Sequence, residues 1–178
     1  MIGGRIAALL SLLVAGALAT ANAQPQATWV EHRPSGSGYR IEFPDTPRQS
    51  QDEVVTAAGP VRMQIARLEW SADVVYLAMH SDYPAGMLPD DPQSALDAAR
   101  NASVKSVNGI LREEKKLTAG DKPARRLLID IPEGRRVGGA LIVLDGNRLY
   151  RAVGVVPAGQ EGSADLKKFL DSFALVKR

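Results

Sequence analysis

Alternation of apolar and polar residues is the commonest pattern in this chain, and it predicts a protein dominated by β-strands. Residues 39–43 show it most clearly, because Tyr39, Ile41 and Phe43 fall on one face of an extended chain. Turns containing glycine, proline, asparagine or aspartate separate this run from similar ones. The predicted strands are residues 28–32, 39–43, 53–57, 61–70, 74–80, 110–118, 124–131, 135–144 and 148–156.

The pattern also ranks the strands by their expected place in a sheet. Residues 74–80, 135–144 and 148–156 are largely apolar on both faces, which predicts central strands covered from both sides. Residues 110–118 instead include the charged run Arg-Glu-Glu-Lys-Lys, which is typical of an edge strand that avoids pairing with other molecules.

Two helices interrupt the strands. Asp91 and Pro92 form a good helix start, the alanine-rich residues 93–107 follow, and Asn108-Gly109 supplies a left-handed stop. The second helix is predicted over residues 163–173. Its apolar stripe consists of Leu166, Phe169, Leu170 and Phe173.

These elements together predict an α+β fold. We expect an antiparallel β-sheet of about seven strands, flanked by helices in an α/β/α arrangement. Strands that are apolar on both faces need cover on both faces, which favours this layered arrangement over a barrel.

The first 23 residues predict a cleavable signal peptide. Arg5 precedes a nearly uninterrupted apolar run, and Ala21-Asn22-Ala23 has the small residues of a cleavage site, so we expect cleavage after Ala23. The alternative is an uncleaved N-terminal anchor. Cleavage implies a periplasmic or secreted bacterial protein whose single globular domain is residues 24–178. The chain has no cysteine, so no lipid can be attached to one.

Charge excludes two classes of partner. The 178-residue chain carries 22 basic and 20 acidic side chains, and loss of Arg5 with the signal peptide leaves a net charge of +1. Nucleic-acid binding needs a larger basic surplus, and so does strong attachment to anionic lipid. We therefore expect neither nucleic-acid binding nor a stable membrane anchor after cleavage.

No combination of residues predicts catalysis, a metal site or a cofactor. His80 and Asp82 offer two ligands on one strand face, whereas zinc sites usually need three or four. Ser35 and Ser37 lie among glycines without the pattern of a nucleophile elbow. The pairs at 125–126 and 135–136 are arginines that form either a small basic patch or, as we favour, ordinary solvated surface.

The connection over residues 81–91 is the candidate binding site. Tyr83, Met87 and Leu88 are apolar where a loop is normally polar. They form either a small recognition patch or a flap that covers the edge of the core. Only the first alternative makes them binding residues.

Three segments resemble the PsbP/Mog1/DcrB-like group of proteins. Residues 38–44 (Gly-Tyr-Arg-Ile-Glu-Phe-Pro) are similar to the group's early strand motif, and residues 147–152 to its strand before the last helix. Residues 169–173 (Phe-Leu-Asp-Ser-Phe) resemble its closing signature. The resemblance implies an α/β/α fold with an antiparallel sheet. It does not imply one function, because a shared fold hosts many.

The sequence leaves three functions open. The first is a soluble, non-enzymatic periplasmic protein that binds another envelope protein or assists an assembly. The second is a carrier or sensor of a small apolar ligand held between sheet and helices. The third, an envelope hydrolase, is disfavoured by the lack of a visible nucleophile, base or metal set.

Overall fold

A computed structural model describes residues 27–56 and 59–177 of the chain. The predicted signal peptide, residues 1–23, lies outside these ranges. None of the helices within them is long and apolar enough to cross a membrane.

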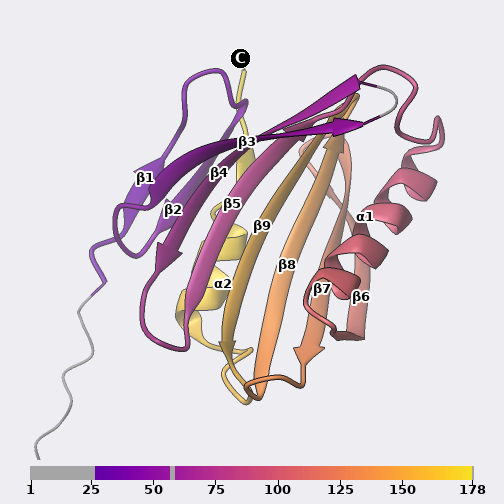
Figure 1. The fold of residues 1–178 in the computed structure, drawn as a ribbon. Helices are drawn as coiled ribbons and strands as arrows, with labels where there is room; N and C mark the ends of the chain where they lie inside the picture. The colour runs from indigo at the N-terminus through magenta and orange to yellow at the C-terminus, as the bar shows by residue number, and fades with distance from the viewer. Residues whose placement is uncertain (1–26, 57–58, 178) are drawn as a thin grey trace, which may run out of the picture.

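A seven-stranded antiparallel sheet forms the centre of the fold (Figure 1). Its order is β3-β4-β5-β9-β8-β7-β6, so the apolar strands lie inside and the charged β6 lies at an edge, as predicted. The strands in that order are Arg48–Thr56, Gly59–Glu69, Val75–Asp82, Arg148–Pro157, Arg136–Asp145, Lys122–Ile131 and Ile110–Ala119.

One face of this sheet is covered by a second, smaller sheet and a helix. Strand β2 (Tyr39–Phe43) pairs with β1 (Val30–His32) and with β10 (Ala174–Leu175), and helix α2 (Ala164–Asp171) packs beside them. Helix α1 (Pro92–Ser106) contacts β7 and β8 through the other face. The predicted α+β fold with an α/β/α arrangement is therefore confirmed.

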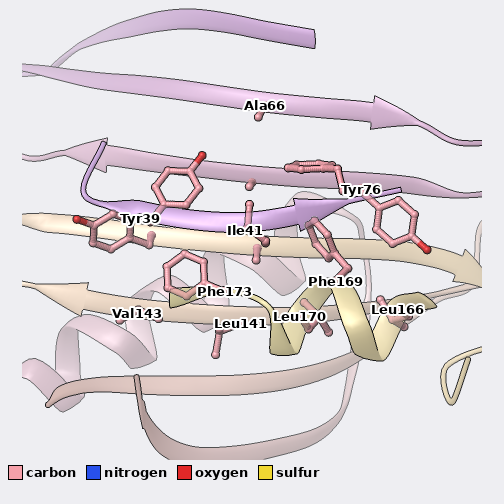
Figure 2. Packing of buried hydrophobic residues seen from close by; sticks show 14 of the residues in the cluster. Tyr39, Ile41, Ala66, Tyr76, Leu141, Val143, Leu166, Phe169, Leu170 and Phe173 are labelled. Atoms are coloured by element: carbon pink, nitrogen blue, oxygen red, sulfur yellow. The ribbon is translucent and has the colours of Figure 1, made fainter. Parts of the chain in front are cut away.

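The larger core lies between the main sheet and α2 (Figure 2). Phe169 of α2 is fully buried, and its ring lies 5.1 Å from that of Phe43 and 4.9 Å from that of Tyr76. Gly139 and Gly154 pair across β8 and β9 directly beneath Leu166. A Cβ atom at Gly154 would lie 2.3 Å from a Leu166 methyl group, so the missing side chain lets α2 approach the sheet.

The smaller core lies under α1. Asp91 caps this helix by accepting from the backbone N–H groups of Gln93 and Ser94, as the sequence predicts. The helix buries only Ala95, Leu96 and Ala99. These mostly small residues bring α1 close to the sheet over a narrow strip.

Most strand bounds differ from the prediction by at most two residues, and two strands differ more. Strand β3 begins at Arg48, five residues before the expected start at residue 53, because its exposed edge position needs no apolar alternation. The short β10 was not predicted. It forms because the backbone N–H and C=O groups after α2 pair with β2 at Tyr39 and Arg40.

Candidate functional site

The main sheet has an uncovered apolar surface beside α1. The helix packs on β7 and β8, whereas β9 and β5, the next two strands, have no helix over them on this face (Figure 1). Val75, Leu77 and Met79 of β5 are only partly buried. The prediction of cover on both sides is therefore wrong on this face for residues 74–80 and for residues 148–156.

This surface is the floor of a groove of about 530 Å³, within the range of small-molecule sites. The floor consists of rows of side chains that lie opposite each other on paired strands. Val75 lies opposite Val155, and Leu77 lies opposite Val153. The wall is the second half of α1. It consists of Ala102, Ser103 and Ser106, followed by the C-cap residue Val107.

Small side chains create the space. On β8, Gly138 and Ala140 continue the rows of Val155 and Val153 toward the helix, and neither fills the gap between floor and wall. Ala102 on the facing side of α1 is equally short. The groove therefore reflects both the small residues at these positions and the lack of a helix over β9 and β5 among the described residues.

The charged residues that line the groove are all arginines: Arg67, Arg136 and Arg151. Arg67 forms an exposed ion pair with Glu69, at 3.0 Å. Within the described part of the chain, Arg136 and Arg151 make neither a hydrogen bond nor an ion pair, and the Nε atom of each is buried. The groove is therefore apolar with an excess of positive charge.

Arg125, on the same face of the sheet, is a buried arginine that has partners, in contrast to Arg136 and Arg151. Its side chain is 1% exposed, and it contacts Gln93, Asp97 and Glu114. Its Nε atom lies 2.8 Å from a Glu114 carboxylate oxygen, at an angle outside hydrogen-bond geometry. The hydrogen bond from Arg125 lowers the pKa of Asp97. This buried arginine, which has a structural role, is therefore paired with carboxylates.

The arginine pairs noted in the sequence do not form a patch. Arg125 and Arg126 are neighbours on β7, so they point to opposite faces. Arg126 pairs with Asp171 of α2. Arg135 is exposed in a turn, whereas Arg136 lines the groove. Arg135 therefore lies on ordinary solvated surface, as expected. Arg125 does not, because it is buried in an ion-pair network.

Tyr83, Met87 and Leu88, the predicted candidates, lie in a different place from the groove. Tyr83 and Leu88 are partly buried against the core cluster under α1. The backbone N–H of Met87, also partly buried, closes a turn by donating to Pro84. The first two side chains thus cover the core edge, and none of the three lines the groove.

The histidine-aspartate pair is built into the fold. His80 is 2% exposed, and its Nε2 atom lies 3.9 Å from Asp82. Arg148 holds Asp82 and also donates to the carbonyls of Gly36 and Ser37, which ties the first loop to the sheet. Over the described ranges, no group of three or more histidine and acidic residues is placed to hold a metal ion.

No protein-family model matches the chain, and no curated protein matches it either. Among solved structures, it is similar to cyanobacterial PsbP (CyanoP) from Synechocystis sp. PCC 6803, with a TM-score of 0.58. That match is 13% identical and covers 89% of this chain and 98% of the other. A Pseudomonas aeruginosa protein of unknown function matches 78% of this chain and 86% of its own, at 15% identity and a TM-score of 0.36. The chain has a PsbP-like fold.

Proposed function

We propose that this protein is an exported, non-enzymatic binding protein that carries or senses a small apolar ligand in the groove beside α1. The observation that carries the proposal is the groove itself. About 530 Å³ of space lies over partly exposed valine, leucine and methionine side chains on otherwise central strands. Burial of such a surface by a ligand is favourable by the hydrophobic effect.

The alternative of binding another envelope protein through residues 81–91 has less support. Tyr83 and Leu88 are partly buried against the core cluster, so only part of their apolar surface is left for a partner. The groove offers a larger apolar surface in a concave shape, which suits a small molecule better than a flat protein contact. Capture of an envelope partner stays a prediction.

The test is binding of a neutral fluorescent probe, N-phenyl-1-naphthylamine, to the purified domain of residues 24–178. We expect saturable binding with increased fluorescence, because the probe leaves water for an apolar site. Ala102→Trp should weaken binding about tenfold or more, because the indole would occupy the groove.

Ala98→Trp is the matched control. Ala98 lies one turn earlier on α1, is exposed like Ala102 and does not line the groove. It should bind the probe like the unmodified domain. Absence of saturable binding, or equal weakening by both tryptophans, would overturn the proposal.

Export is tested separately on the full chain, expressed in a bacterium with a C-terminal tag. We expect the tagged protein in the periplasmic fraction or medium, with Gln24 at its N-terminus by mass spectrometry. Ala23→Phe should block cleavage, because signal peptidase requires a small residue there. A cytoplasmic product that keeps residues 1–23 would contradict export.

A further inference from the structure

We infer that the ligand of the groove is a long-chain carboxylate, and that one of two arginines at opposite ends of the groove, Arg151 or Arg136, recognises its anionic head. This inference rests on the proposed function and adds the chemical class of the ligand. It is carried by two buried arginine Nε atoms without partners in a groove whose other lining is mostly apolar.

Arg151 lies on the floor of the groove. It is on β9, where its neighbours across the sheet are Met79 of β5 and Ile142 of β8. Both neighbours are apolar, whereas the guanidinium is cationic. An arginine kept among apolar side chains without an anion is unfavourable, and a carboxylate would supply the missing charge-assisted hydrogen bonds.

Arg136 lies toward the opposite end. It pairs with Pro157 of β9, six residues from Arg151, so the two backbone positions are about 20 Å apart. Its guanidinium lies beside the turn at Gly134. Between the two arginines the floor is formed by Val153 and Val155. A long apolar strip with a cation toward each end fits an extended hydrocarbon chain with an anionic terminus.

Charge favours an anion over the other apolar ligands. Among the described residues that line the groove, none is acidic, so a cationic amphiphile would meet only repulsion. A neutral ligand would leave both guanidinium groups without an anion, whereas a carboxylate would pair with one of them. Two carboxylates neutralise Arg125 on the same face, as expected for an arginine with a structural role, whereas Arg136 and Arg151 have no carboxylate partner among the described residues.

The experiment compares dodecanoate with dodecanol, which share one chain and differ in the head. Each competes with N-phenyl-1-naphthylamine for the purified domain at pH 7.5. We expect dodecanoate to bind at least about tenfold more tightly than dodecanol, because one charge-assisted hydrogen bond contributes about that factor. The double variant Arg136→Met, Arg151→Met should lose this preference and still bind the neutral probe and dodecanol. The single variants then show which arginine holds the head.

Two controls separate a role of the groove arginines in ligand recognition from a role in the stability of the fold. Arg62→Met removes an exposed arginine of β4 that pairs with Glu53 outside the groove, and it should keep the full preference. The midpoint of thermal unfolding of Arg151→Met should stay the same or rise, because no ion pair or hydrogen bond among the described residues is lost and a buried Nε–H group without a partner is removed. A structural arginine would instead lower the midpoint.

The outcomes distinguish this inference from the proposed function. Equal binding of dodecanoate and dodecanol, with the neutral probe bound, overturns the carboxylate assignment and leaves the groove as a site for neutral ligands. A preference that survives in the double variant assigns the anion to other residues and also overturns the inference. If the neutral probe does not bind, both proposals fail.

Discussion

Replacement of Phe169 by alanine tests whether α2 holds the two sheets together. The side chain is fully buried, and its ring contacts that of Phe43 in the small sheet. It also contacts the ring of Tyr76 in the main sheet (Figure 2). Truncation of a buried phenylalanine costs about 3–5 kcal/mol. Loss of two aromatic contacts, each worth about 0.5–1.5 kcal/mol, places this site in the upper half of that range.

Urea unfolding, followed by tryptophan fluorescence, measures the effect. With a slope of about 2 kcal/mol per molar, a loss of about 4 kcal/mol lowers the midpoint by about 2 M. Lys167→Ala is the control on the same helix. It removes only an exposed ion pair with Asp171 and should change stability by less than about 0.5 kcal/mol. A midpoint for Phe169→Ala equal to that of Lys167→Ala, at the same slope, would refute the role given to α2.

Three further substitutions test the packing, the charges and the response to pH. Gly154→Ala should cost about 1–3 kcal/mol in urea unfolding, and less when combined with Leu166→Ala, because the added Cβ meets a Leu166 methyl group. Arg125→Lys should cost about 1–3 kcal/mol, because a single ammonium cannot contact all three partners; a stability equal to that of the unmodified protein contradicts this. Burial lowers the pKa of His32, so the unfolded chain binds the proton more readily and stability falls as pH drops below about 6.5. His32→Gln lacks this titration, so unfolding measured from pH 7.5 to 5 should show the variant gaining stability relative to the unmodified protein; a constant difference refutes the assignment.

The sequence predicts most of the fold because period and burial agree along most of the chain. The run 39–43 gives β2 with its bounds unchanged, since its alternation reflects one buried and one partly exposed face. β10 escapes prediction because two residues give no period, and it depends on the docking of α2. The early part of β3 escapes because an exposed edge strand has no apolar face to detect.

The candidate site was less accessible to sequence reasoning. Apolar residues on both faces of β5 predict burial. The same pattern occurs in a strand under a helix and in a strand that forms the floor of a groove, so the sequence does not distinguish the two. Arg125 and Arg151 are both arginines in apolar strands. Only the structure shows that the first meets Asp97 and Glu114, whereas the second has no partner among the described residues.

The dimensions of the layers explain why an open groove exists at all. Seven strands at about 4.8 Å spacing make a sheet about 29 Å wide, whereas one helix with its side chains is about 10 Å across. On one face, α2 and the three-stranded sheet share the cover. On the other, α1 is the only helix among the described residues, and it covers little more than two strands. The rest of that face of the sheet is exposed. Exposure is tolerable at the β3 edge, which is polar, but β5 and β9 are apolar on this face. A ligand that buries this strip would give the central strands the second covered face that their sequences predict.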